Sequence, residues 1–169
     1  WHVDYLDTGP DTPVGDRLRL ARPLVADEEM FFANYSDVLT DVSLDDMVER
    51  MHASPTAAAM MLSVRPHATF HVINTREDDT VSGFHRLEEL PIRENGGYLI
   101  MRQSFFDHLG GGRDLNAAFA ELLPTRRLIA YRHDGFWLPA DTFKERAHLD
   151  AMYGSGNVPW GRRGVVTVP

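Results

Sequence analysis

The apolar run Met30–Ala33, followed at once by the polar stretch Asn34–Asp37, constrains the fold of this chain more than any other segment. Five of the six residues from Met30 onward are apolar or aromatic, which predicts a buried strand in a sheet covered on both faces. Open α/β sheets bind ligands at the carboxyl ends of such strands, so Asp37 lies where a ligand site is expected. An Asx-turn or a cap would explain the same aspartate.

Asp141 is a second acid in a similar setting. It follows the strand predicted over Leu128–Arg132 and precedes a helix predicted over Phe143–Tyr153, where Thr142 and Glu145 have capping-box spacing. An N-terminal cap is one interpretation of this acid, and a metal ligand on a rigid support is the other. The presence of two acids in matching positions favours the functional interpretation of both.

The composition narrows the class of protein. A chain of 169 residues, 43% of them hydrophobic, predicts one domain over residues 1–169 with a substantial core. The 25 acids outnumber the 17 bases, which argues against a nucleic-acid partner but not against a nucleotide ligand. There is no cysteine, so disulfides and thiolate zinc sites are excluded. No apolar run approaches ~20 residues, so we expect no membrane partner and a cytoplasmic location.

Further strands are predicted over Ala57–Val64 and Tyr98–Met101, and a hairpin is predicted from Phe70 to Phe84. Between them, the segment Asn95–Gly97 suits either a sugar hydroxyl or an ordinary turn, because Asn95 brings one acceptor and two donors.

The loop Asp7–Arg17 is rich in turn-forming residues. It is either a plain surface connection or a flap whose hydroxyls and Arg17 reach an anionic ligand.

Three groups of residues together resemble the glucose-1-phosphate cytidylyltransferases, which are sugar-nucleotide pyrophosphorylases. The groups are Phe32–Asp37 with Leu39–Val42, Asn95–Tyr98, and Tyr131–Trp137 with Pro139–Thr142. The match runs in register from about Val3 to Trp160, and its most specific part is the closing stretch Asp134–Thr142.

The resemblance implies an α/β, Rossmann-like nucleotide-diphospho-sugar transferase fold with a mixed central sheet. It implies a reaction of CTP with glucose 1-phosphate that gives CDP-glucose and pyrophosphate, and a homo-oligomeric assembly. One Mg²⁺ would be held by Asp37 and Asp141, which would be the catalytic residues. The matching nucleotide-binding positions are Thr12, Arg17 and Ser36, and the matching sugar-binding positions are Glu94, Asn95, Gly96 and Trp137.

Two departures from the family pattern are visible. The segment Phe84–Glu94 has no lysine where the family carries one on the sugar phosphate, which leaves Arg86 or Arg93 as replacements. The family's Gly-Gly-x-Gly-Thr-Arg loop and its following lysine would lie upstream of Trp1. We therefore expect the C-terminal two thirds of such a domain, lacking its N-terminal strand-loop-helix and inactive as given.

Two alternatives remain open. The first is a catalytically degenerate module of the same fold that binds a sugar nucleotide or assembles with partners. The second is a metal-dependent glycosyltransferase, against which the Ala140–Thr142 stretch argues.

Overall fold

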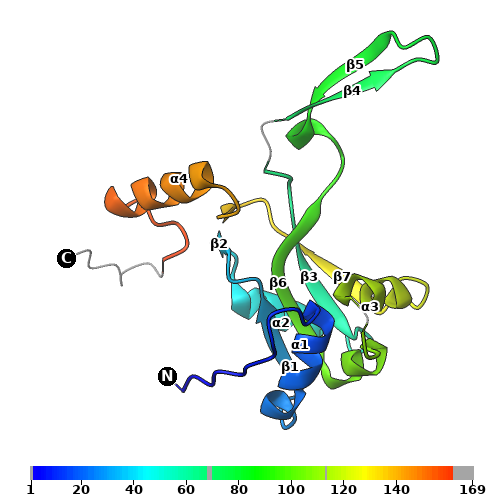
Figure 1. Ribbon diagram of the computed structural model, residues 1–169, viewed down its shortest axis with the longest axis vertical. Coiled ribbons are helices and arrows are strands. Elements are labelled where there is room, and N and C mark those ends of the chain that lie inside the picture. Colours follow the sequence, from blue (N-terminus) through cyan, green and yellow to red (C-terminus); the bar gives the residue numbers. More distant parts are fainter. Residues whose placement is uncertain (1, 68–69, 113, 162–169) are drawn as a thin grey trace. The chain divides into compact units, whose positions relative to one another are not determined.

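The computed structural model describes residues 2–67, 70–112 and 114–161 (Figure 1). Its largest sheet has four strands in the order β1-β6-β3-β7. Their bounds are Met30–Asn34 for β1, Glu94–Arg102 for β6, Ala59–Val64 for β3 and Leu128–Arg132 for β7.

Strand directions in this sheet are mixed. β1 and β6 are antiparallel, with Met30 opposite Arg102 and Asn34 opposite Tyr98. β3 and β7 run parallel, because Ala58 N–H donates to the Arg127 carbonyl and His133 N–H donates to the Ser63 carbonyl. The α/β fold class with a mixed sheet, which the resemblance implied, is therefore confirmed.

The strand β1 differs from its prediction. It lies at the edge of the sheet among the described strands, and while Phe31 is buried, Phe32 on the opposite face is 42% exposed. The expectation of a central strand covered on both faces is therefore wrong for β1. β3 has that character instead, since it lies between two neighbours and five of its six residues are buried.

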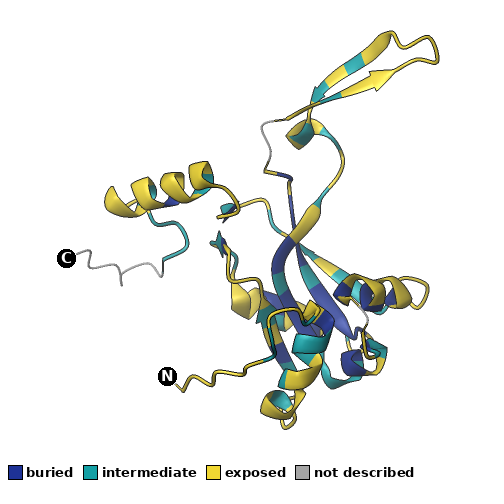
Figure 2. Cartoon of the chain, viewed as in Figure 1, coloured by how far each residue is buried: buried dark blue, intermediate teal, exposed yellow. Residues whose placement is uncertain are grey.

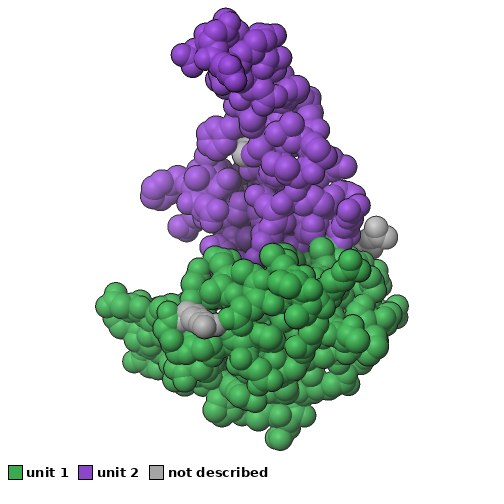
Figure 3. Space-filling view, turned by 90° about the vertical axis from the view of Figure 1, so that its right-hand side faces the viewer, with its two compact units in different colours: residues 1–34, 45–61, 98–131 green, residues 35–44, 62–97, 132–169 purple. Residues whose placement is uncertain are grey.

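The chain divides into two compact units, coloured separately in Figure 3. Unit 1 comprises residues 1–34, 45–61 and 98–131, and unit 2 comprises residues 35–44, 62–97 and 132–169. The single nucleotidyltransferase domain over residues 1–169 remains a prediction.

Unit 1 holds most of the aromatic core. The helices are α1 (Val14–Ala21), η1 (Arg22–Val25), α2 (Leu44–His52), η3 (Gln103–His108) and α3 (Leu115–Leu122). The ring of Phe105, which is fully buried, lies 5.6 Å from that of Phe119. Met47 and Met51 on α2 are also fully buried, as their spacing predicts.

Unit 2 is built from short pairings. β2 (Val38–Thr40) pairs antiparallel with β8 (Trp137–Pro139), and β4 (His71–Thr75) pairs with β5 (Val81–Arg86), which leads into η2 (Leu87–Glu89). The helix α4 (Phe143–Gly154) has a single buried residue, Leu149, and Figure 2 shows how much of α4 and of the hairpin is exposed. In the described part of the chain, no helix is both long and apolar enough to span a membrane.

Replacing Phe105 with alanine tests the core of unit 1. We expect Phe105→Ala to lower the free energy of unfolding by about 3–5 kcal/mol, because it removes a fully buried ring and leaves a cavity. Leu123→Ala is the matched control, since Leu123 is 63% exposed and its truncation should cost less than about 1 kcal/mol. Denaturant unfolding followed by circular dichroism measures both. Equal losses in the two variants would contradict the assignment of Phe105 to the core.

Candidate functional site

The pairing of β2 with β8 brings the two predicted acids close together within unit 2. The register places Val38 opposite Pro139. One step beyond the ladder, the Ala140 N–H donates to the Asp37 carbonyl over 2.7 Å. Asp141 is the next residue, one position past the partner of Asp37, so the two backbones are close at this point, and both aspartates are exposed. Sequence patterns missed this pairing because each strand has only three residues.

The backbone around each acid is held by other groups. The Tyr35 N–H donates to the Gly97 carbonyl over 2.9 Å, which fixes the turn that carries Asp37. At the other acid, Thr142 is the N-cap of α4: its hydroxyl accepts from the Glu145 N–H, and the Glu145 carboxylate accepts from the Thr142 N–H. The capping box is confirmed, and the helix cap is Thr142 rather than Asp141.

The carboxylates of Asp37 and Asp141 fit a magnesium ion in their chemistry. Mg²⁺ takes one or two protein carboxylates and completes its shell with water and substrate phosphate oxygens. Within residues 2–67, 70–112 and 114–161, there is no cluster of three or more His, Asp or Glu side chains that could hold a metal by itself. The donor set at Asp37 and Asp141 therefore suits a metal shared with a ligand rather than a closed structural site.

The four predicted sugar-binding residues lie on β6 and β8. The Trp137 indole N–H donates to the Gly96 carbonyl over 2.8 Å, which ties the start of β8 to β6. The Gly97 N–H donates to the Asn95 side-chain oxygen over 3.1 Å. The Glu94 carboxylate accepts from the His67 N–H over 3.2 Å. The structure thus joins Gly96 to Trp137 directly and presents Glu94 and Asn95 as exposed neighbours.

The glycines lie within β6 and not in a separate turn, for two different reasons. A Cβ atom at Gly96 would lie 2.9 Å from the Leu62 side chain and 3.0 Å from that of Val64, so the two strands approach too closely for any side chain. Gly97 has φ of +78°, a conformation that favours glycine. The interpretation of Asn95–Gly97 as an ordinary turn is therefore wrong.

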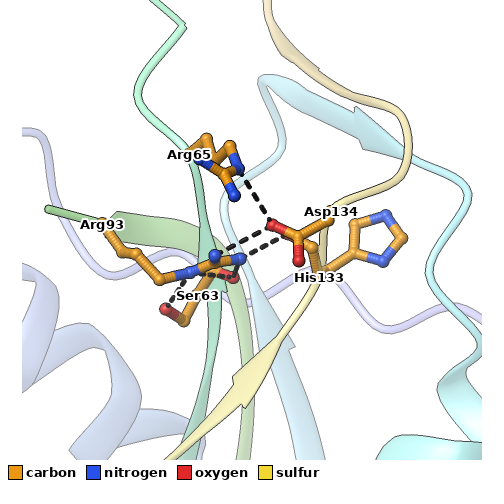
Figure 4. A network of polar contacts seen from close by, with 5 residues as sticks. All are labelled: Ser63, Arg65, Arg93, His133 and Asp134. Atoms are coloured by element: carbon orange, nitrogen blue, oxygen red, sulfur yellow. Dashed lines mark hydrogen bonds and ion pairs between the residues drawn. The ribbon is translucent and has the colours of Figure 1, made fainter. Parts of the chain in front are cut away.

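A polar network joins the ends of β3 and β7 (Figure 4). Arg93 donates from Nε to the Ser63 hydroxyl (3.0 Å), from Nη2 to the Ser63 and His133 carbonyls (2.8 and 2.6 Å), and from Nη1 to Asp134 (2.9 Å). Arg65 Nε also donates to Asp134, over 3.2 Å. The hydrogen bond from Arg93, helped by the charges of both guanidinium groups, holds the pKa of Asp134 below its ordinary value.

This network was not predicted from the sequence. Arg93 contacts residues 30 and 41 positions away, and no local spacing indicates such contacts. A second missed contact joins His133 Nε2 to Asp41 Oδ1 over 2.8 Å. The Asp134–Gly135 pair was the one available signal, because it marks a turn.

A cavity of about 180 Å³ lies beside this network. Its polar lining includes Arg65, His67, Glu88, His133 and Asp134, and Trp137 contributes an aromatic wall. The cavity lies entirely in unit 2.

Thr12 and Arg17 belong to unit 1 and are engaged with their own loop. Arg17 donates to the Thr12 carbonyl, the Thr8 hydroxyl and the Pro10 carbonyl, each over 2.8 Å. The Thr12 hydroxyl donates to the Thr8 carbonyl. Arg17 would have to leave these partners to reach a ligand. Ser36 is exposed in the turn before β2.

No family model matches the chain. Among curated proteins, it is similar to the glucose-1-phosphate cytidylyltransferases of Salmonella typhimurium (25% identical) and Salmonella typhi (24% identical), over 95% of this chain. These matches confirm the resemblance predicted from the motifs. The chain spans 63% of the length of these relatives.

Two solved structures share the fold. One is UDP-glucose pyrophosphorylase complexed with UDP-glucose (TM-score 0.62, 14% identity, 90% of this chain and 66% of that chain). The other is HddC from Yersinia pseudotuberculosis complexed with GMP-PN (TM-score 0.57, 11% identity, 88% of this chain and 65% of that chain). At these identities the likeness concerns the fold alone.

Replacing Gly135 with alanine tests the contact between β7 and the segment after β2. The added Cβ would lie 2.6 Å from both Asp41 Oδ1 and His133 Cε1, so the two side chains must separate. Both contacted groups are the ends of side chains and can move, so we expect Gly135→Ala to break the His133–Asp41 bond and to lower the free energy of unfolding by about 0.5–1.5 kcal/mol.

Gly154→Ala is the control, because a Cβ there meets nothing within 4 Å. Chemical unfolding of both variants measures the difference. A Gly135→Ala protein as stable as its Gly154→Ala counterpart would contradict the described contact.

Proposed function

We propose that the protein is a Mg²⁺-dependent sugar-1-phosphate nucleotidyltransferase that converts CTP and glucose 1-phosphate to CDP-glucose and pyrophosphate. The observation that carries the proposal is the pairing that brings the backbones at Asp37 and Asp141 close together beyond the β2–β8 ladder. The names of the similar curated proteins support the choice of reaction.

The reaction joins two anions, so charge is its main obstacle. A phosphate oxygen of the sugar phosphate attacks the α-phosphorus of CTP, and the bond to pyrophosphate breaks in line with it. Asp37 and Asp141 would hold the Mg²⁺, which when bound would neutralise negative charge on the phosphate oxygens and the leaving pyrophosphate. The hydrogen-bonded backbone beside both acids supports this role, because it holds the positions from which the two side chains project.

The sugar would bind against β6 and β8. The bond from Trp137 to the Gly96 carbonyl holds the indole ring in one orientation, and a fixed aromatic face suits the apolar side of a sugar ring. Asn95 offers its amide donors, and Glu94 offers a carboxylate oxygen for hydroxyl groups. Thr12, Arg17 and Ser36 remain the proposed nucleotide contacts.

A sugar-nucleotide-binding module of the same fold is the second candidate. It is favoured by the engagement of Arg93, since all three of its guanidinium nitrogens donate within the protein. Arg93 is then a poor replacement for the lysine that the family places on the sugar phosphate.

Replacing either aspartate with asparagine tests the metal assignment. We expect Asp37→Asn and Asp141→Asn, each made in the complete protein, to reduce Mg²⁺-dependent pyrophosphate release by roughly 100-fold or more, because a metal contributes several kcal/mol to such a transition state. The unfolding midpoint should stay unchanged, since Thr142 caps α4.

Asp150→Asn, on the helix that follows Asp141, is the matched control. Asp150 is exposed and makes only a 3.9 Å surface pair with Arg146, which should contribute little. Near-normal turnover in the Asp37→Asn, Asp141→Asn double variant would refute the metal assignment.

A competition assay tests the base. With CTP, UTP and dTTP at equal concentration, we expect CTP to be consumed preferentially, by about tenfold or more. When a binding site matches the hydrogen-bonding groups of one base, a different base leaves at least one polar group of the site unpaired. An unpaired buried polar group costs about 1–3 kcal/mol. Equal consumption of the three nucleotides would contradict cytidylyl specificity while leaving nucleotidyl transfer intact.

A further inference from the structure

One arginine at the cavity beside the polar network keeps hydrogen-bond donors that the network does not use. Three arginines lie on or near its rim: Arg65, Arg86 and Arg93. Arg93 is only 21% exposed and donates from all of its guanidinium nitrogens to Ser63, His133 and Asp134. Arg86 pairs through Nη1 with Glu88, whose carboxylate lies at the cavity.

Arg65 is engaged differently. Its side chain is 62% exposed, and its one hydrogen bond among the described residues uses Nε. The two terminal nitrogens, Nη1 and Nη2, therefore remain available for a ligand. A guanidinium group that is anchored through Nε still presents a planar pair of donors, which is the geometry that binds phosphate oxygens in bidentate fashion.

The backbone that carries Arg65 is firmly held. Val64, the last residue of β3, is 2% exposed, and Pro66 is buried. A residue before proline is restricted to extended conformations. On the far side of the proline, the His67 N–H donates to the Glu94 carboxylate. Because this backbone is already ordered, Arg65 loses less conformational entropy when it binds a ligand.

The donors of Arg65, and not a surplus of positive charge, favour an anion here. Arg65 and Arg93 share one carboxylate, Asp134, through the same oxygen, and Arg86 pairs with Glu88. Two further carboxylates bond to lining residues, Glu94 to the His67 N–H and Asp41 to His133 Nε2. The Nη1 and Nη2 atoms of Arg65, which are unbonded among the described residues, are therefore what an anionic group would bind.

The size and walls of the cavity restrict the ligand. Its volume of about 180 Å³ is below the ~300–1,000 Å³ of ordinary drug-sized sites, and Trp137 forms one wall. A monosaccharide ring against the indole, with a phosphate group at the guanidinium, matches this combination of size, charge and surface.

We propose that Arg65 binds the phosphate group of a monosaccharide phosphate in this cavity, and that Asp134 and Arg93 act as positioning residues that hold Arg65 in place. The identity of the ligand as a sugar 1-phosphate rests on the proposed function. The placement of the positive charge rests on the cavity and its hydrogen bonds.

Calorimetric titration with glucose 1-phosphate and with unphosphorylated glucose tests the proposal. We expect Arg65→Gln to weaken glucose 1-phosphate binding by about tenfold or more, as for the loss of one charge-assisted contact, and to leave glucose binding unchanged. The affinity of Arg65→Lys for glucose 1-phosphate should lie between those of the unchanged protein and Arg65→Gln, because lysine keeps the charge and loses the planar donor pair. Arg76→Gln is the control, since Arg76 is an exposed arginine that bonds to Thr80 in the hairpin turn. Unfolding midpoints verify that each variant is folded.

Three results of these titrations would overturn the proposal. One is unchanged glucose 1-phosphate affinity in Arg65→Gln, and another is an equal loss in Arg76→Gln. The third is a loss that appears in Arg86→Gln but not in Arg65→Gln, which would move the phosphate to the other arginine.

Pyrophosphate release from CTP separates this proposal from the proposed function. Turnover in Arg65→Gln with an unchanged KM for glucose 1-phosphate refutes the role of Arg65 and leaves the nucleotidyltransferase intact. Binding of glucose 1-phosphate that depends on Arg65, in a complete protein that releases no pyrophosphate, supports the role of Arg65 and refutes the enzyme.

Discussion

The guanidinium group of Arg93 is the interaction on which the rest of the candidate site depends. It bonds at once to Ser63 near the end of β3, to the His133 carbonyl just after β7, and to the Asp134 carboxylate. The His133 carbonyl lies just past the end of β7, where the ladder stops, and a carbonyl removed from water needs a donor. One planar cation with five donors reaches this carbonyl, Ser63 and Asp134 together, which a lysine could not do. Arg93 therefore fixes the position at which the chain leaves β7 and continues to β8.

From that starting point the chain reaches both acids through short, specific contacts. The segment after Asp134 turns at Gly135, where a Cβ atom would collide with Asp41 and His133. It then enters β8, where Trp137 bonds to Gly96. The pairing of β8 with β2 then brings the backbone at Asp141 close to the backbone at Asp37. Each step is a backbone or side-chain contact within unit 2, so the sugar-binding and metal-binding candidates share one support.

The sequence predicted long or strongly patterned elements well. The buried strand β3, the hairpin β4–β5, and the helix α4 with its capping box all appear where periodicity and turn residues indicate. It failed where a contact between distant residues decides the outcome. The exposure of Phe32 depends on which strands and helices pack beside β1, and the residues of β1 alone do not specify this. β2 and β8 are too short for a pattern, and each is stabilised by the other.

The candidate site shows the same division. Asp37 and Asp141 could be chosen because acids at strand ends are informative by themselves. Arg86 and Arg93 were the two candidates for a phosphate contact because their charges are visible in the sequence, whereas the groups that already bond to each are not. Arg65 was missed, since nothing local distinguishes an arginine before a proline from any other surface arginine. Charge can be read from a sequence, but whether a charge is already neutralised cannot.

The capping of α4 by Thr142 separates the chemistry of the site from the stability of the fold. Thr142 and Glu145 satisfy the first turn of the helix, and Asp141 is exposed just before it. The side chain at position 141 can therefore change at little cost to the fold. A designer who wants to add or remove a ligand group at this edge of unit 2 can begin there without a compensating stabilising substitution.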